Sequence, residues 1–260
     1  MLQVTQLQLE TWVGQFVWPF FRVLALIMAA PVYSQNSISV RTKVGLAAAI
    51  ALVLAPTLPP AAIPLGSAAA WLAVAEQMLA GFIIGFSLQI VFGALDLAGD
   101  MLGLQMGIGF ATFIDPQNST QTPLVGSLLS LLATLLFLAI DGHLLVLDAL
   151  VGSFQLIPVG SMTGAGANAG LATFANWEHF ARLGTHLFAL GLQISLPLLA
   201  TMLLCNLTLG VMARAAPQLN LFSVGFPVTV LTGLGVLILF LPGLAAPLGT
   251  AILQALQLWR

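Results

Sequence analysis

The chain has 260 residues, of which 60% are hydrophobic and only 5% are charged, and its formal net charge is −2 at pH 7. Because a soluble domain carries about 25% charged residues, this composition excludes a water-soluble globular protein and predicts an integral membrane protein. The few Lys and Arg residues form no basic patch, which excludes a nucleic-acid-binding surface, and the single cysteine excludes an intrachain disulfide.

The first two predicted helices occupy residues 12–30 and 44–55. Residues 12–30 are about long enough to cross a bilayer core, which needs roughly 20 apolar residues. Arg22 lies inside this span, and we expect it to face protein or to snorkel, because a lipid-facing charge is costly. Pro56 begins a proline-rich connector that cannot continue the second helix.

A third helix is predicted over residues 67–108, which is too long for one simple span. Small and polar residues recur along it at steps of three and four and so share one face; they are Gly81, Gly85, Gln89, Gly93, Asp96, Asp100, Gly103 and Gly107. Such a stripe lets another helix approach closely, or it lines a wet interior. Asp96 and Asp100 are like charges one turn apart, which favours the wet interior. Gln89, Asp96 and Asp100 are therefore candidate lumen or packing residues.

Residues 101–123 interrupt the apolar sequence near its middle. The stretch contains several glycines, an Asp115-Pro116 step that ends a helix, and a polar run over residues 117–122. It also holds more apolar side chains than a surface loop usually does. An apolar, glycine-rich loop between membrane helices suggests a plug, a gate or a buried packing element, and the residue pattern alone leaves all three open.

Two helices are predicted after this interruption, over residues 124–140 and 144–154. Asp141 and His143 lie between them, and we interpret them as a local turn. One His and one Asp are too few ligands for a closed metal site, so we expect neither a metal nor a cofactor.

The last two predicted helices cover residues 183–211 and 226–258, and the second is expected to be kinked or broken near Pro242 and Pro247. The turn between them contains Arg214, Pro217 and Asn220. Taken together, the elements predict an all-α integral membrane protein of about six long, partly broken hydrophobic helices arranged as hairpins. Broken spans are tolerated only when protein buries them or water fills the cavity beside them, which favours a transporter or a subunit of a larger assembly.

Three long stretches closely resemble one known family. They are PVYSQNSISVRTK at residues 31–43, GDMLGLQMGIGFATFIDPQNSTQTPLVG at residues 99–126 with its continuation to residue 154, and MARAAPQLNLFSVGFPV at residues 212–228. In this order they resemble the FliR family of flagellar biosynthetic proteins, which are relatives of the T-type export-apparatus proteins of injectisomes.

The resemblance implies a non-enzymatic structural subunit of the core export gate of the flagellar type III secretion system, in the bacterial inner membrane at the flagellar basal body. One copy would join P-type and Q-type proteins around a channel for unfolded flagellar subunits, in contact with membrane lipid. The B-type switch protein and the A-type export protein would associate with that core. The resemblance also implies a P-type-like part over residues 1–175, followed by a Q-type-like helical hairpin over residues 176–260.

The resemblance further implies that residues 105–118 form a plug loop in the channel. Its apolar plug residues would be Met106, Ile108, Phe110, Phe113 and Ile114, and its hinges and anchors would be Gly103, Gly107, Gly109, Asp115 and Pro116. An apolar constriction can exclude water and ions, and methionine is unbranched enough to yield to a passing chain.

Two other classes compete with this interpretation. A secondary transporter or ion channel with discontinuous helices would usually show matching halves and a central charged site, and neither is evident. An intramembrane enzyme would need a catalytic motif of the kind that sequence patterns reveal, and none is found.

Overall fold

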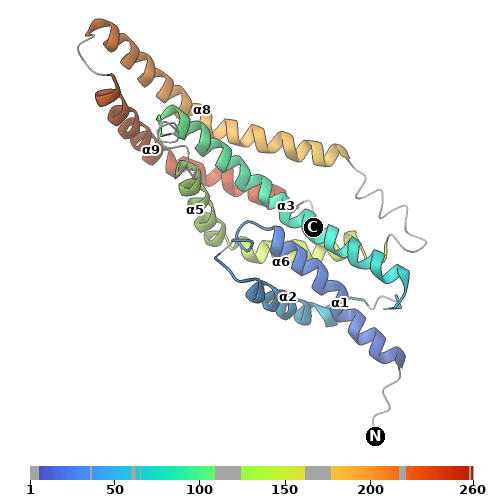
Figure 1. Cartoon of the computed structure of the whole chain (residues 1–260). Coiled ribbons are helices and arrows are strands. Elements are labelled where there is room, and N and C mark those ends of the chain that lie inside the picture. Colours follow the sequence, from blue (N-terminus) through green and yellow to red (C-terminus); the bar gives the residue numbers. More distant parts are fainter. Residues whose placement is uncertain are drawn as a thin grey trace. The chain divides into compact units, whose positions relative to one another are not determined.

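The structure, a computed structural model, describes residues 6–35, 37–59, 63–64, 66–108, 124–161, 177–216, 221–257 and 259. All the regular structure within these residues is helical, and they contain no strand (Figure 1). The elements are α1 (Gln6–Ala29), α2 (Val40–Leu54), η1 (Ala55–Thr57), α3 (Ala68–Gln105), α5 (Leu124–Ala139), α6 (Gly142–Leu156), α8 (Trp177–Ala215) and α9 (Leu221–Gln257). The predicted all-α class is confirmed.

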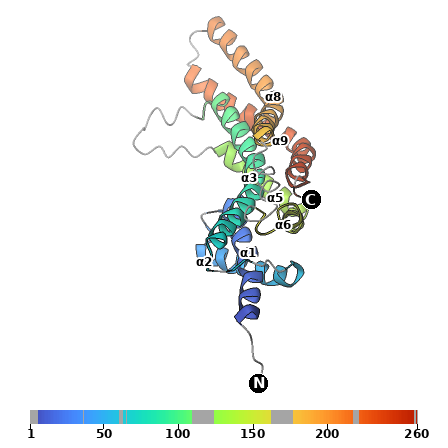
Figure 2. The same cartoon turned by 90° about the vertical axis from the view of Figure 1, so that its right-hand side faces the viewer.

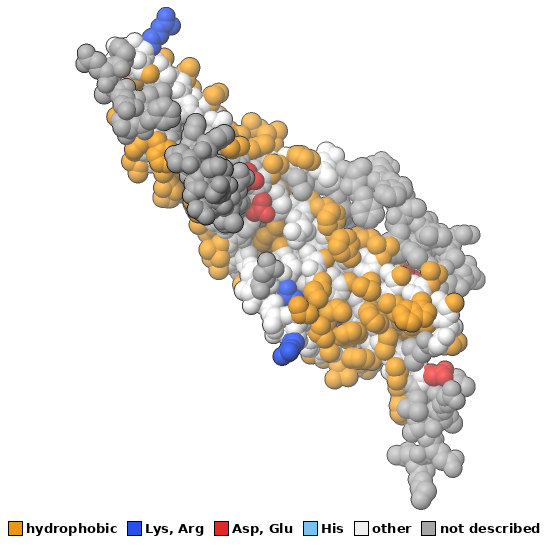
Figure 3. Space-filling view, viewed as in Figure 1, with side chains coloured by type: hydrophobic (Ala, Val, Ile, Leu, Met, Phe, Trp, Pro, Cys, Tyr) orange, Lys and Arg blue, Asp and Glu red, His pale blue; other side chains and the backbone are white. Residues whose placement is uncertain are grey.

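Most of these helices are long and apolar enough to cross a membrane. Five of them satisfy this by length and composition, namely α1, α2 with η1, α3, α8 and α9, and α5 with α6 makes a sixth span if the pair counts as one. This matches the predicted number of about six. Hydrophobic side chains cover much of the face seen in Figure 3, and charged side chains are few. The chain is an all-α integral membrane protein.

The prolines of α9 do not interrupt it. The helix continues through Pro227, Pro242 and Pro247, so the expected alternative of a break near Pro242 or Pro247 is wrong. Prolines are tolerated in membrane helices because local adjustments and neighbouring groups can satisfy the backbone carbonyls that proline leaves unpaired.

The chain divides into two compact units that interleave along the sequence. Unit 1 comprises residues 1–89, 141–183 and 252–260, and unit 2 comprises residues 90–140 and 184–251. The first part of α3 therefore belongs to unit 1 and its last part to unit 2.

Unit 1 is built on close contact between α1 and the first part of α3, which lie side by side (Figure 1, Figure 2). A Cβ added at Gly81 would collide with the backbone carbonyl of Arg22, and one at Gly85 would lie 2.6 Å from the Cβ of Ala29. Glycine on a helix surface lets two backbones approach this closely. Of the two alternatives left open for the stripe, helix packing is the one that holds at these two positions.

Unit 2 uses the same device between other helices. A Cβ at Gly99 of α3 would collide with the backbone of Gly126 on α5, and one at Gly191 of α8 would lie 3.0 Å from the Ala94 carbonyl oxygen. Helices α8 and α9 meet where the Cys205 thiol lies 3.7 Å from the Thr232 hydroxyl. The last part of α3 is thus packed against both α5 and α8.

The connection between α1 and α2 is held by polar contacts. Ser39 caps α2 by accepting a hydrogen bond from the Thr42 backbone N–H at 3.3 Å. The Lys43 ammonium donates to the Ser34 carbonyl oxygen at 2.8 Å. Burial in this connection raises the pKa of the Tyr33 phenol.

Candidate functional site

The C-terminal end of α3, where the predicted plug loop begins, is a regular helix stop. Gly107 adopts a left-handed conformation with φ 77°. Its N–H donates to the Leu104 carbonyl at 3.1 Å, and the Ile108 N–H donates to the Gly103 carbonyl at 3.1 Å. These two bonds form the Schellman motif, in which a glycine beyond the helix end turns the chain away. Gly107 therefore ends α3 before Asp115 and Pro116 are reached.

Met106 is buried at this helix end, in unit 2. Its side chain is 2% exposed, and a Cβ at Gly233 of α9 would lie 2.5 Å from its Cγ and 2.7 Å from its Sδ. The missing side chain at Gly233 leaves the space that Met106 fills. The Thr229 hydroxyl, one turn earlier on α9, lies 3.0 Å from the Met106 carbonyl oxygen and 2.9 Å from the Phe226 carbonyl oxygen, so its one proton is shared between these two acceptors.

The preceding residue, Gln105, is bound from the other helix of the hairpin. The side-chain amide of Asn206 on α8 donates to the Gln105 Oε1 at 3.1 Å and approaches the Gln105 carbonyl oxygen at 3.4 Å. An unpaired amide in an apolar surrounding is costly. These contacts therefore offset the cost of placing Asn206 in a mainly apolar stretch of α8.

The other predicted plug, hinge and anchor residues divide into two groups. Ile108 is half-buried in the turn that follows α3, and a Cβ at Gly103 would meet nothing within 4 Å. The rest lie outside the described residues; they are Gly109, Phe110, Phe113, Ile114, Asp115 and Pro116.

The polar members of the α3 stripe remain at the surface of this chain. Gln89 in unit 1, and Asp96 and Asp100 in unit 2, are exposed. The Ser130 hydroxyl of α5 donates to the Asp96 carboxylate at 2.6 Å. The acidic pair therefore has one partner in α5 and leaves carboxylate surface available to water, cations or another chain.

Unit 1 contains a buried polar group that we call the Arg22 cluster, formed by Arg22, Gln77, Ser153 and the Ile157 carbonyl. The guanidinium is fully buried. It donates to Gln77 Oε1 at 2.8 Å, to Ser153 Oγ at 3.0 Å and to the Ile157 oxygen at 2.7 Å. It also lies 3.9 Å from the centre of the Phe154 ring, a favourable place for a cation. The expectation that Arg22 faces protein is confirmed.

A carboxylate accompanies this cluster. Glu76 is 1% exposed and acts on Arg22 through its charge. It accepts hydrogen bonds from the Ser161 hydroxyl at 2.7 Å and from the Ser161 N–H at 3.2 Å. The charged side chains therefore tie the segment after α6 to α1 and α3.

The turns singled out in the sequence lie only partly within the described residues. Asp141 takes a left-handed conformation with φ 55° at the bend before α6, and the described residues contain no group of three His, Cys, Asp or Glu able to hold a metal. Arg214 is exposed in the last turn of α8, where a cation is favourable. Pro217 and Asn220 lie outside the described residues.

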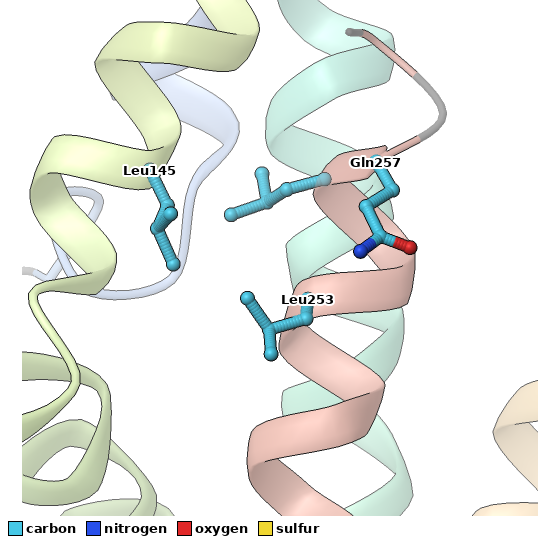
Figure 4. A pocket seen from close by; sticks show the side chains of 4 residues that line it. Leu145, Leu253 and Gln257 are labelled. Atoms are coloured by element: carbon cyan, nitrogen blue, oxygen red, sulfur yellow. The ribbon is translucent and has the colours of Figure 1, made fainter.

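A small apolar notch lies in unit 1, between α6 and the end of α9. Leu145 and Leu253 line it together with Leu256 and Gln257 (Figure 4). It offers room for about one water molecule, so it is a gap in packing and not a binding site for a solute.

Comparison with known proteins identifies the chain. Residues 13–255 match the family described as bacterial export proteins, family 1. The flagellar biosynthetic protein FliR of Escherichia coli (strain K12) is 41% identical over 246 residues, which cover 94% of this chain and 91% of that protein. The chain belongs to the FliR family. The FliR of Pectobacterium carotovorum subsp. carotovorum is 42% identical, with 93% and 90% coverage, and that of Bacillus subtilis (strain 168) is 31% identical, with 83% and 81% coverage.

Three residues of this FliR family member that hold the end of α3 were not expected from its sequence. Asn206 and Thr229 are polar residues within long, mainly apolar helices, and such residues are often buried against protein. Their residue types were therefore a weak sign that they pack against another helix. Gly233 carried none, because α9 contains other glycines at which a Cβ would meet nothing, such as Gly235.

Proposed function

We propose that this FliR family member is a structural, non-enzymatic subunit of the core export gate of the flagellar type III secretion system. The observation that carries the proposal is the family match over residues 13–255, which covers all or most of each described helix that is long enough to span a membrane. Its relatives are named as flagellar biosynthetic proteins, and the family is described as bacterial export proteins.

The chain would work within an assembly in the bacterial inner membrane at the flagellar basal body. Large apolar side chains on α8 and α9 stay exposed in the single chain, among them Leu203, Leu204, Leu207, Leu231, Ile238 and Leu239. Large apolar side chains that stay exposed in such numbers are covered by lipid or by other protein. We infer that one copy binds P-type and Q-type proteins, with its P-type-like part over residues 1–175 and its Q-type-like hairpin over residues 176–260. The B-type switch protein and the A-type export protein bind that core.

Within this assembly, residues 105–118 form the plug that keeps the channel closed to ions. The apolar character of Ile108, Phe110, Phe113 and Ile114 supports this role, because an apolar constriction excludes water, while Met106, which is buried against α9, would anchor the start of the plug. Gly107 supports it as well, since its left-handed conformation turns the chain out of α3.

The plug is tested by deleting residues 107–113 and measuring ion leak across the membrane together with assembly of the complex. The expected result is an assembled complex that leaks ions. A matched control removes residues 164–170, a run of Gly, Ala and Asn of equal length, and should stay ion-tight. An assembled complex that remains tight after the first deletion contradicts the plug.

The assembly is tested by purification in mild detergent with and without the P-type and Q-type partners. The chain should be stable only with them, and a well-behaved monomer that binds a small solute would favour a transporter instead.

Asp96→Ala and Asp100→Ala test the acidic pair. Loss of export with intact assembly supports a wet lumen, and loss of assembly supports packing.

A further inference from the structure

We propose that Asn206, Thr229 and Gly233 form a seat for the C-terminal end of α3, and that this seat positions residues 105–108. We call these three residues the α3 seat. They come from the two helices of the α8–α9 hairpin, and all of them belong to unit 2 together with the residues they hold. The seat makes them positioning residues for the proposed gate, and its functional consequence rests on the proposed function.

The α3 seat supplies partners to backbone carbonyls at the end of α3. The last carbonyls of a helix have no partner within it and need one from elsewhere. Three carbonyls at the end of α3 are paired locally, those of Leu102, Gly103 and Leu104, by the N–H groups of Met106, Ile108 and Gly107. The next two are reached by side chains: the Asn206 amide lies 3.4 Å from the Gln105 carbonyl oxygen, and the Met106 carbonyl shares the Thr229 hydroxyl with the Phe226 carbonyl. The α3 seat thus completes what the helix cap leaves unpaired.

The α3 seat also fits the Met106 side chain sterically. Gly233 has no side chain, and the Met106 side chain fills the space that a Cβ would take. Met106 is almost fully buried there, so any side chain at position 233 must displace it. Gly235, two residues later on α9, would add a Cβ into open space. Only one of these two glycines is therefore required by a contact.

The contacts of the α3 seat come from two helices, so they define the direction of the end of α3 as well as its position. A single hydrogen bond would leave the helix end free to pivot. Here Asn206 holds Gln105 from α8, while Thr229 and Gly233 hold Met106 from α9. Residues 105–108 consequently leave α3 in a direction set by the hairpin, and a shift between α8 and α9 would redirect them.

The contact itself is tested by disulfide cross-linking in the complete export complex in native membranes. In a Cys205→Ser background, the pair Met106→Cys and Gly233→Cys should form a disulfide under mild oxidation, detected by loss of thiol labelling and by peptide mass. The control pair, Met106→Cys and Gly235→Cys, should keep both thiols, because Gly235 lies on another face of α9. Equal cross-linking of the two pairs, or none for the first, overturns the seat.

The positioning role is tested by a graded series at the two glycines. Gly233→Ala and then Gly233→Val should raise ion leak and lower export of flagellar subunits progressively, while Gly235→Ala and Gly235→Val leave both unchanged. In a Met106→Ala background, where the space is free, Gly233→Ala should have no further effect. A Gly233 series that matches the Gly235 series, in a complex where the cross-link forms, overturns the positioning role. The proposed plug itself fails if deletion of residues 107–113 leaves the assembled complex tight.

Discussion

The two units of this chain bury polar groups in different ways. In unit 1 the Arg22 cluster buries a full charge and surrounds it with side chains, a carbonyl and the carboxylate of Glu76. In unit 2 the α3 seat uses neutral side chains that donate to backbone carbonyls, and a glycine that makes room. Leaving a buried charge unpaired costs more free energy than losing one neutral hydrogen bond. We infer that the Arg22 cluster maintains the fold of unit 1, and that the α3 seat can be altered without unfolding unit 2.

The largest effect is expected from Arg22→Ala. This change leaves the partners of the guanidinium unpaired and the Glu76 charge uncompensated, which should lower the free energy of unfolding by about 3–5 kcal/mol. Thermal unfolding of the purified complex, and the amount of chain in the membrane, measure this. Arg22→Lys should lower the free energy of unfolding by a smaller amount, because an ammonium keeps the charge but cannot reproduce the planar set of donors of the guanidinium. Arg41→Ala, at an exposed site, is the control, and equal behaviour of Arg22→Ala and Arg41→Ala would contradict the distinction between the units.

The next effect concerns helix approach in unit 2. At Gly99 an added Cβ meets the backbone of Gly126, which cannot move aside as a side chain can. Gly99→Ala should therefore destabilise the chain by about 1–3 kcal/mol. Gly103→Ala, one turn later in open space, should be neutral or should stabilise α3 by about 0.5–1 kcal/mol. The midpoints of thermal unfolding of the two variants give the comparison, and a reversed order would refute the close contact between α3 and α5.

A smaller effect is expected where the neutral contacts of the α3 seat are removed singly. Thr229→Val and Asn206→Leu each delete one side-chain donor, and such hydrogen bonds between membrane helices contribute about 0.6 kcal/mol on average. Stability should fall little, while ion leak rises. Thr208→Val, on an exposed part of α8, serves as the control. A stability loss as large as that of Arg22→Ala would show that the seat supports the fold of unit 2.

The smallest effect tests how far burial in unit 1 extends into the connection after α1. Tyr33 is the only tyrosine of this chain, so an NMR titration of a complex in which this chain alone carries labelled tyrosine reports its phenol alone. Burial raises its pKa in the folded chain above the usual value of about 10. The corresponding stability is present below pH 10 and is lost as the pH rises through the folded pKa. A midpoint equal to that of the denatured chain would show that the connection is open to water.

Much of the architecture was predictable because it depends on local composition. The helices follow from the length of the apolar runs, and the end of α3 was expected near residue 108 and lies at Gln105. The placement of Arg22 against protein followed from the cost of a charge in lipid. In contrast, the sequence left open whether α9 is kinked or broken near Pro242 and Pro247, and the structure shows that the helix continues through both prolines, because its surroundings can compensate for the proline ring.

The sequence by itself determined the class of protein, the approximate spans and the family, since these reside in composition and in long motifs. Only the tertiary structure decided which polar and small residues are paired. Arg22 binds groups 55, 131 and 135 residues away, and Thr229 binds a carbonyl 123 residues away. Such partners are set by which helix faces meet, and a helical repeat specifies a face without specifying its neighbour. Gly233 and Gly235 are two glycines of the same helix, and the sequence does not distinguish them. The folded chain shows that only Gly233 makes room for Met106.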